Sequence, residues 1–448
     1  MSKEINIRKG LDIKLVGIAE KVLVKAPSAK TYALCPDNYV GVKPKMLVKV
    51  DDKVKAGTPL FFDKENPEIL FTSPVSGTVA EIRRADKRKI LAVIIAADDA
   101  NEAEQLDVIE PKTATKQQAK DLLLKSGLWT ALIQRPFGII ANPKDEPRDI
   151  FISALDTAPL GVDMDFILQD QQQNLTAGIE LLAKLTEGEV YLSIGQDATA
   201  GALPKIKNAK ISIFKGKHPA GNVGTQIAKI KPIAKGDIVW TIDPSHVVMI
   251  GKLALTGIPN FEKTIAVAGS QIKKTSYAKI VSGAQIESFT NNNIEGDNYR
   301  LISGNPLTGV KVETDGYVGF YHNVVSAIPE GDYYEFVGWA MPRLGKFSTS
   351  RSYASFLTPN KKFDLDTNLN GGERAFVLNG IYDKVTPLDI YPVYLIKAVM
   401  AGDIDKMEQL GIYEVIEEDL ALCEFICPSK IEWQSILRQG INQLIKEI

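Results

Sequence analysis

Short runs of alternating hydrophobic and polar residues dominate the first hundred positions, with turn-forming residues between them. Runs of this length, rich in β-branched and aromatic residues and bounded by Gly, Pro and Asp, are typical of β-strands. They follow one another between residues 31 and 97 as TYAL, YVGV, MLVKV, PLFF, EILFTSP, GTVAEI and ILAVIIAA. Residues 1–100 are therefore predicted to form a β domain, and the polar segment 101–118 to be a linker.

The pattern changes after residue 118, where helical periodicity alternates with buried-type strands. Helices are predicted over residues 119–129 and 165–188, and strands over FGIIAN, DIFISAL, EVYLSIG, AKISIFK and DIVWTID. This alternation indicates a Rossmann-like α/β sheet over residues 119–255. Its glycine loops are weak, because neither GxGxxG nor GxxxxGKS/T occurs and HPAGNVGTQ offers only Gly221 and Gly224. A plain turn is the favoured interpretation of HPAGNVGTQ.

Two further regions complete the predicted organisation. Residues 256–330 consist of short strands and glycine turns, compatible with a β-grasp module of the soluble ligand-binding kind (SLBB-like), for which we favour a docking surface over a ligand pocket. Residues 331–448 pass from irregular sequence to amphipathic helices, with Gly402 as a helix break and Asp403 as the next N-cap. The predicted fold class is α/β and multidomain, with a C-terminal helical domain.

The first domain resembles the barrel-sandwich hybrid of biotinyl and lipoyl carrier proteins. The segment VDDKVKAGTPLF is similar to their GDxVxxGxxL turn, and SPVSGTVAEI to the strand that follows their modified hairpin. In those carriers the modified Lys lies eight residues before the Pro of the second segment, which is Pro74 here. That position is Asn66, beside Pro67, and Lys64 is two residues out of register. The resemblance therefore implies a carrier fold without the carrier Lys.

Composition and charge narrow the function classes. Of 448 residues, 45% are hydrophobic and 24% are charged, and the net charge is −2. This balance is ordinary for a soluble multidomain protein and provides no basic surface for nucleic acid. The longest apolar run is ILAVIIAA, far short of the roughly 20 residues of a spanning helix. We therefore expect a soluble or peripheral cytoplasmic protein without a transmembrane segment and without a nucleic-acid partner.

The cysteines and histidines are the remaining candidates for metal or redox chemistry. Cys423-x3-Cys427-Pro resembles the end of the bacterial ferredoxin run C-x2-C-x2-C-x3-C-P, but Glu417 and Leu420 occupy its two leading positions. We interpret the two thiols as buried structural residues, the relic of a degenerate ferredoxin-like cluster motif, rather than as ligands shared with a partner. The histidines lack metal-ligand spacing: His218, His246 and His322. No catalytic residue and no metal site is predicted.

A set of segments in a fixed order carries a more specific resemblance, which covers essentially the whole chain. They are SGLWTALIQRPFGIIANPKDEPRDIFISALDTAPL (residues 126–160), HPAGNVGTQ, GWAMP, KFSTSR, TPLDIYPV and DLALCEFICPSK. Through them the chain resembles the A subunits of the sodium-translocating NADH:quinone reductases. That family is related to the C subunit of the Rnf complex and to the NADH-binding flavoprotein subunit of complex I. Both of these carry a Gly-rich flavin loop where this chain has bulky residues from Trp129 to Phe137.

This resemblance implies a peripheral subunit on the cytoplasmic face of the bacterial inner membrane, in a six-subunit complex. The complex passes electrons from NADH through FMN, FAD and a 2Fe–2S centre in partner subunits to quinone, and it exports sodium ions. This chain is expected to hold no redox cofactor itself and to bind quinone as a substrate ligand. The sequence leaves open whether the quinone is ubiquinone or menaquinone.

Two segments have the composition of a quinone slot, which needs apolar walls and a donor to the quinone carbonyls. The slot is predicted from two sets of residues: Leu34, Tyr39, Val40 and Gly41 in the first, and Arg135, Pro136 and Phe137 in the second. Tyr39 and Phe137 are predicted to stack on the ring, and Arg135 to donate to a carbonyl. In the alternative interpretation the two aromatics are core residues and Arg135 joins a surface ion pair. That alternative leaves a structural capping subunit without a ligand site.

Overall fold

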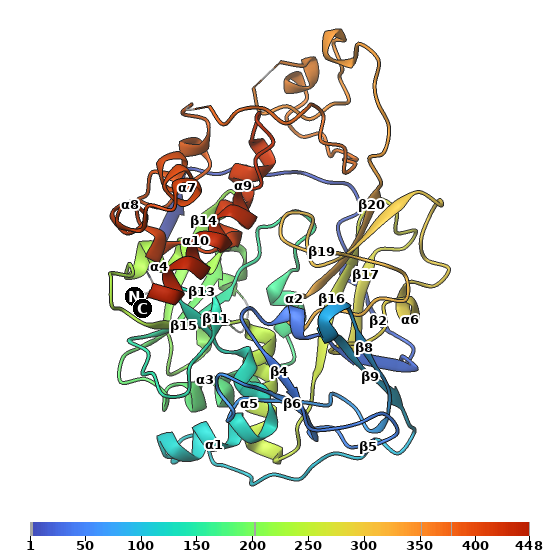
Figure 1. The fold of residues 1–448 in the computed structure, drawn as a ribbon, viewed down its shortest axis with the longest axis vertical. Coiled ribbons are helices and arrows are strands. Elements are labelled where there is room, and N and C mark those ends of the chain that lie inside the picture. Colours follow the sequence, from blue (N-terminus) through green and yellow to red (C-terminus); the bar gives the residue numbers. More distant parts are fainter. Residues whose placement is uncertain (1–2, 201–202, 351, 378, 448) are drawn as a thin grey trace.

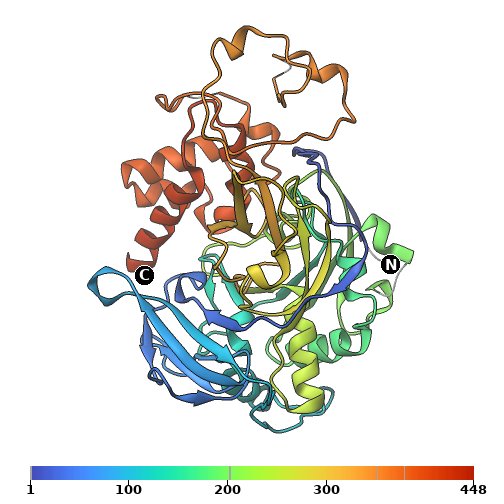
Figure 2. The ribbon, with the colours of Figure 1, turned by 90° about the vertical axis from the view of Figure 1, so that its right-hand side faces the viewer.

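The computed structural model describes residues 3–200, 203–350, 352–377 and 379–447. Its sheets define an N-terminal β domain, an α/β domain and a β-grasp domain, and helices follow at the C-terminal end (Figure 1). In the side view the yellow β-grasp strands lie centrally, with the blue β domain below them and the red helices to the left (Figure 2). Among the described residues, no helix combines the length and the apolarity that a membrane span requires.

In the described residues, the N-terminal β domain has two small sheets around one apolar core. One sheet has the order β3 (Thr31–Leu34), β9 (Ile90–Ala97), β8 (Gly77–Arg84) and β5 (Lys53–Val54). The other has the order β4 (Pro44–Met46), β6 (Pro59–Asp63) and β7 (Leu70–Thr72). The core includes side chains that are at most 1% exposed: Leu60, Phe61, Phe71, Val79 and Val93. Strict alternation of buried and exposed positions does not hold in β6, where the consecutive residues Leu60 and Phe61 are both buried and the pairing with β7 is irregular.

Two of the strands predicted in this domain are wrong. YVGV lies in a turn, because the short 3-10 helix η1 (Pro36–Asn38) leads into Tyr39 and the Val42 N–H bonds to the Tyr39 carbonyl at 3.3 Å. Gly41 has a φ of 80°, a left-handed conformation that suits glycine and ends an extended run. MLVKV contributes only Met46 to a strand, at the end of β4.

The α/β sheet has the strand order β1, β14, β13, β12, β15, β10 and β11. The bounds are β1 (Lys3–Ile7), β10 (Ile133–Arg135), β11 (Ile139–Ile140), β12 (Ile150–Ala154), β13 (Val190–Gly195), β14 (Lys210–Gly216) and β15 (Val239–Ile242). From β12 the chain builds outward through β13 and β14, then returns to the other side of β12 as the parallel strand β15. β1 pairs with β14, so the first residues of the chain complete this sheet.

The α/β domain also contains helices, which are α1 (Lys116–Ser126), α2 (Met164–Leu168), α3 (Gln172–Leu182), α4 (Val223–Ile230) and α5 (Pro244–Thr256). α1 is the helix predicted over 119–129, and it ends at Gly127 with a φ of 80°. The single helix predicted over 165–188 is wrong, because the chain breaks between α2 and α3. The break falls in QDQQQ, which offers no apolar position for burial. HPAGNVGTQ turns, as predicted, and then enters α4 at Val223.

The β-grasp sheet follows in the sequence. Its order is β19 (Val310–Val312), β18 (Tyr299–Ser303), β20 (Val324–Pro329), β16 (Glu262–Ala268), β17 (Ser276–Val281) and β2 (Leu23–Lys25), with a short helix α6 (Glu287–Thr290). β2 comes from the N-terminal segment and runs parallel to β17. The first hundred residues therefore contribute strands to all three sheet-containing domains, and this segment links the domains to one another.

The C-terminal region confirms the predicted helices. They are α7 (Pro392–Ala401), α8 (Ile404–Gln409), α9 (Glu417–Ile426) and α10 (Trp433–Glu447). Gly402 ends α7 with a φ of 68°, and the Asp403 carboxylate accepts the Lys406 N–H at the start of α8. Before them, the described part of segment 331–377 has 3-10 turns, such as η7 (Ala354–Leu357), and an isolated parallel bridge between Phe363 and Leu15. Much of this segment lies at the top of Figure 1, in orange.

Candidate functional site at the junction of three domains

An aromatic cluster joins the N-terminal β domain to the β-grasp domain. Tyr39, which follows η1, is 4% exposed. Its ring lies 4.7 Å from that of Phe71 in an edge-on contact, and 5.6 Å from the rings of both Phe320 and Tyr321. Phe320 and Tyr321 belong to the loop that precedes β20. One predicted site residue is therefore the centre of an interdomain contact.

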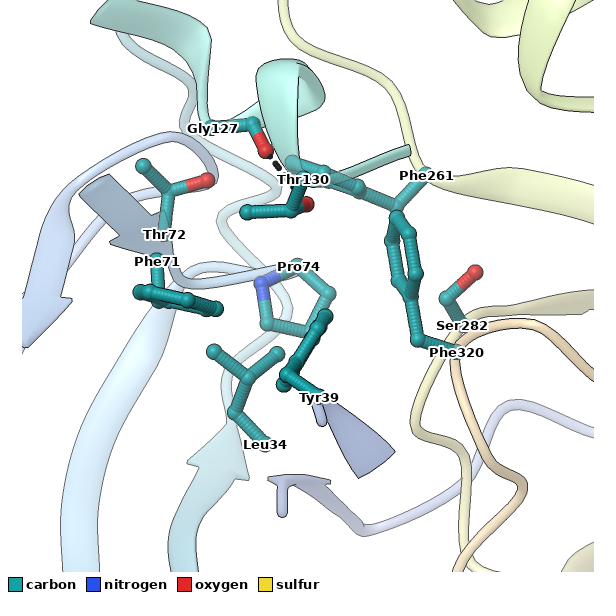
Figure 3. A pocket seen from close by; sticks show the side chains of 10 residues that line it. All are labelled: Leu34, Tyr39, Phe71, Thr72, Pro74, Gly127, Thr130, Phe261, Ser282 and Phe320. Atoms are coloured by element: carbon teal, nitrogen blue, oxygen red, sulfur yellow. Dashed lines mark hydrogen bonds between the residues drawn. The ribbon is translucent and has the colours of Figure 1, made fainter. Parts of the chain in front are cut away.

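A small cavity lies beside this cluster (Figure 3). Its volume of about 10 Å³ has room for about one water molecule. It is lined by Leu34, Tyr39, Phe71, Thr72, Pro74, Gly127, Thr130, Phe261, Ser282 and Phe320. These residues come from the N-terminal β domain, the loop after α1, and the β-grasp domain. We call this space the three-domain cavity.

One polar group of the three-domain cavity is uncommitted. The hydroxyls of Thr72 and Thr130 donate to the carbonyls of Ser126 (2.9 Å) and Gly127 (2.7 Å). Ser282 is 3% exposed, and its hydroxyl has no hydrogen-bond partner among the described residues. Among the three lining hydroxyls, only that of Ser282 is therefore without a hydrogen-bond partner in the described part of the chain.

The other residues predicted for the first half of the slot lie around Tyr39. Leu34, at the end of β3, is buried and lines the cavity. Val40 is 37% exposed, and Gly41 is exposed with open space where a Cβ would be. The chain therefore turns away from the cavity directly after Tyr39.

The second half of the predicted slot lies against the C-terminal helices instead. Arg135, at the end of β10, is 1% exposed, and its Nη1 donates to Asp419 Oδ2 at 2.7 Å and its Nη2 to Glu418 Oε1 at 2.6 Å. Burial, which lowers the pKa of Arg135, is outweighed by the two carboxylates, and the net pKa is raised. The expected ion pair exists, but it is buried rather than on the surface.

Pro136 and Phe137 continue this contact. Pro136 is buried, and the half-buried Phe137 has its ring 6.4 Å from that of Tyr413. The Phe137 carbonyl accepts a hydrogen bond from Arg438 Nη1 at 2.9 Å. None of the three residues from Arg135 to Phe137 lines the three-domain cavity. The structure therefore does not bring the two halves of the predicted slot together.

The HPAGNVGTQ loop has a steric reason for the glycine at position 224. A Cβ at this position would lie 2.3 Å from Asp419 Oδ1, so glycine is required for the approach of that carboxylate. The Asn222 side chain also donates to the Glu418 carbonyl at 3.0 Å. The anion accommodated at the start of α4 is thus a carboxylate of the chain itself.

The switch point of the α/β sheet lies between β12 and β15, where strand order reverses. Ligands of open α/β sheets bind outside the carboxyl ends of the strands at such points. Here the β-grasp loop enters this place: Asn323 Nδ2 donates to Asp243 Oδ2 at 2.8 Å, and the Phe320 ring stacks on His246 at 4.5 Å. Both residues belong to the segment IDPSH, which begins at the end of β15 and leads into α5.

Lys263 in β16 belongs to no motif and has no spacing that would indicate a functional role. It is 4% exposed, and its Nζ donates to the carbonyls of Phe320 (2.7 Å), His322 (2.8 Å) and Gly319 (3.4 Å). Burial lowers the pKa of Lys263 to about 7, although Asp243 opposes this shift. Burial also lowers the pKa of both His246 and His322 to about 4. The loop of Phe320 is therefore held by a buried amine.

The two C-terminal cysteines are buried, as interpreted from the sequence. The Tyr382 hydroxyl lies 3.2 Å from Cys427 Sγ, and the Thr386 hydroxyl lies 3.3 Å from Cys423 Sγ. Burial raises the pKa of Cys423 to about 12. At Cys427, burial is outweighed by hydrogen bonds, that of Tyr382 foremost, and its pKa is lowered. Within the described ranges, no cluster of three or more His, Cys, Asp or Glu residues is placed to hold a metal ion.

Two further features, the hairpin of Lys64 and a second cavity, lie away from the three-domain cavity. Lys64 and Asn66 lie in the hairpin between β6 and β7, where the Lys64 side chain is exposed and the Asn66 carbonyl accepts the Ile69 N–H at 2.9 Å. A larger cavity of about 180 Å³ lies between α5 and the β16–β17 face. Its charged lining, which includes Lys252, Glu262 and Lys279, is unlike an apolar quinone slot.

Comparisons with known proteins match this domain organisation. Family models described as the NqrA N-terminal barrel-sandwich hybrid domain, the NqrA second alpha/beta domain and the NQRA C-terminal domain match residues 5–98, 114–258 and 264–314. The last of these models is of the SLBB type. The barrel-sandwich hybrid, the α/β domain and the β-grasp module predicted from the sequence are thereby confirmed.

Curated relatives match over the whole chain. The A subunit of the Na(+)-translocating NADH-quinone reductase of Shewanella frigidimarina is 39% identical, over 99% of this chain and 100% of the relative. The proteins of the same name from Rhodopirellula baltica and Vibrio anguillarum are 37% and 38% identical, over at least 98% of each chain. The chain belongs to the NqrA family, the A subunits of the Na(+)-translocating NADH-quinone reductases.

Proposed function

We propose that this chain is a peripheral subunit of a sodium-translocating NADH:quinone reductase and contributes a quinone site at the three-domain cavity. The full-length relatives named for that enzyme support the first part. We further place the chain on the cytoplasmic face of the membrane, among the other subunits of a six-subunit complex. In this proposal FMN, FAD, the 2Fe–2S centre and the NADH site belong to partner subunits, and this chain holds none of them.

The observation that carries the quinone site is the free Ser282 hydroxyl in an apolar cavity. A quinone needs flat apolar walls for its ring and a hydrogen-bond donor for a carbonyl. Tyr39 and Phe320 provide aromatic faces, Leu34 and Phe261 provide aliphatic and aromatic wall, and Ser282 provides the donor. Arg135 is not assigned this donor role, because both of its Nη groups are bound to carboxylates.

Access requires the cavity to widen. A volume of about 10 Å³ is too small for a quinone ring. Its walls belong to three domains, so a small displacement of the N-terminal β domain would enlarge it without unfolding any domain. The exposed turn at Val40 and Gly41 lies at the edge of this contact, where a quinone tail would leave the cavity.

A second candidate function is a structural capping subunit without a ligand site. The closed cavity and the buried pair of Arg135 with Asp419 favour it, since both describe domains that are packed together. The two candidates differ in one property, which is saturable binding of quinone by the isolated chain.

Quinone titration followed by Trp fluorescence separates them. Trp129 adjoins the cavity-lining residue Thr130 and is 1% exposed, so it reports on this region. We expect saturable quenching that weakens about five-fold in Ser282→Ala, the loss of one hydrogen bond. The matched control is Ser270→Ala, which removes another partnerless hydroxyl in the same domain outside the cavity. Absence of saturable quenching, or equal weakening in both variants, would support the capping role.

A further inference from the structure

The larger cavity, between α5 and the β16–β17 face, is separate from the three-domain cavity. Among the described residues, none lines both spaces. Its volume is about 180 Å³. An engineered apolar cavity of roughly 150 Å³ binds benzene, so this space has room for a ligand slightly larger than a single ring. The larger cavity can therefore hold a small molecule without any change at the proposed quinone site.

The larger cavity has hydrocarbon on one side only. Its apolar lining residues all come from the α/β domain: Ile167 and Leu168 of α2, and Val248 and Met249 of α5. The lining residues on the β-grasp side are polar: Asn260, Glu262, Lys263, Thr264 and Lys279. A molecule that fills this space therefore meets hydrocarbon along α2 and α5, and polar groups along β16 and β17.

Ammonium groups outnumber carboxylates in this lining. The Glu262 carboxylate pairs with Lys279 at 2.9 Å, and Lys252 Nζ lies 3.8 Å from the same oxygen. Lys263 Nζ donates to three backbone carbonyls instead. Because the attraction between charges weakens with distance, Lys252 loses least by turning to another anion. Its side chain is 37% exposed, which leaves it room to move.

Ser245, in the first turn of α5, adds a hydroxyl that has no hydrogen-bond partner among the described residues. The residue is 8% exposed and lines the larger cavity. A rotation about its χ1 angle turns the hydroxyl toward a ligand, and a hydrogen bond there would remove the cost of a buried, unpartnered group. Ser245 and Lys252 are about two helical turns apart on the same face of α5, with Val248 and Met249 between them. Both polar groups can thus approach a ligand that lies along this face.

We propose that the larger cavity binds a small organic carboxylate, independently of quinone. The carboxylate pairs with Lys252, Ser245 donates to a ligand oxygen, and the hydrocarbon part packs against the apolar lining residues of α2 and α5. Inorganic phosphate is a poorer match, because it leaves the apolar wall uncovered and brings a second negative charge toward Glu262. The bound ligand touches both the α/β domain and the β-grasp domain and so stabilises their contact.

The test is isothermal titration calorimetry of the full chain with benzoate, a single ring that carries one carboxylate. We expect saturable binding at one site, and binding of the neutral analogue benzamide that is weaker by about ten-fold. Lys252→Met should weaken benzoate binding by about ten-fold as well, since it removes the charged partner but keeps an unbranched side chain. Lys274→Met is the matched control, because it removes an exposed amine that does not line the cavity, and it should leave the affinity unchanged.

Glu262→Gln supplies a readout in the opposite direction. It removes the carboxylate that competes for Lys252, so benzoate should bind about three-fold more tightly, which a loss of folding would not produce. No saturable binding of benzoate, equal affinities for benzoate and benzamide, or an unchanged affinity in a folded Lys252→Met chain would overturn the proposal. Inorganic phosphate that binds as tightly as benzoate would also overturn it, because the apolar wall would then play no part.

Discussion

The contact of Arg135 with the C-terminal helices and the contact of Tyr39 with the β-grasp loop are both buried interdomain contacts, but they differ in chemistry. The first compensates a buried charge: Arg135 meets Asp419 at 2.7 Å, and both side chains are at most 1% exposed. The second is made of aromatic rings around a cavity with one free hydroxyl. At the first contact Arg135 Nε and Asp419 Oδ1 also lack hydrogen-bond partners, but both belong to a closed pair of opposite charges, whereas the second contact has a cavity beside its unpartnered hydroxyl.

This difference shows why composition alone could not indicate the partners of Arg135. An arginine beside aromatic residues is a reasonable donor to a carbonyl, and the segment from Arg135 to Phe137 has that composition. Its actual partner, Asp419, lies 284 positions further along the chain. A side chain is available to bind a ligand only when no residue elsewhere in the chain already pairs with it. Whether such a partner exists depends on the tertiary structure.

The largest effect is expected from breaking the Arg135 contact. Asp419→Ala leaves a buried guanidinium without its main counterion, which costs about 3–5 kcal/mol in the free energy of unfolding. Chemical denaturation followed by circular dichroism measures it. Lys235→Ala is the control, because it removes a 69%-exposed partner of Glu408 and should cost at most about 1 kcal/mol. Equal losses in the two variants would mean that the buried pair does not stabilise the fold.

Much of the fold was predictable, and for a physical reason. Strand and helix positions follow from local periodicity, and helix ends such as Gly127, Gly402 and Asp403 follow from the conformations and caps that those residues favour. The strands β1 and β2 were not predicted, because their partners β14 and β17 lie far along the chain. Lys263 was not predicted for the same reason. Its partners are in the Phe320 loop, which is distant in the sequence, and without them Lys263 resembles any other strand residue.

The next largest loss in the free energy of unfolding is expected from breaking the Tyr39 contact. Tyr39→Ala should cost about 3 kcal/mol, because it removes a buried ring that contacts Phe71, Phe320 and Tyr321. Its exposed neighbour provides the comparison, and Val40→Ala should change the free energy of unfolding by about 0.5 kcal/mol or less. The same denaturation assay applies. If Tyr39→Ala were as mild as Val40→Ala, the aromatic contact would be loose enough to admit a ligand without any domain displacement.

Two Gly→Ala substitutions test how closely α4 packs against α9 on the Arg135 side. Gly224→Ala places a Cβ against the Asp419 carboxylate, and overpacking of this kind costs about 1–3 kcal/mol. Gly372→Ala has open space around its Cβ and should be nearly neutral in thermal unfolding. A neutral Gly224→Ala would show that α4 and α9 can separate, and would make the HPAGNVGTQ loop available to an external anion after all.

The change that is smallest for each step of one pH unit is a dependence of stability on pH, and it concerns the Phe320 loop that Lys263 holds. Burial lowers the pKa of Lys263 to about 7 in the folded chain, below its unfolded value of 10.5. Between these pH values the unfolded chain binds more protons, so the free energy of unfolding should rise with pH, by at most about 1.4 kcal/mol per unit from this residue. Below pH 7 both states carry the proton and the contribution is flat. Denaturation of native and Lys263→Met chains at pH 7, 8 and 9 gives the comparison, with Lys279→Met as the control for an exposed amine. Native and Lys263→Met curves that stay parallel across this range would mean that water reaches the amine in the folded state, and the larger cavity that Lys263 helps to line offers the route.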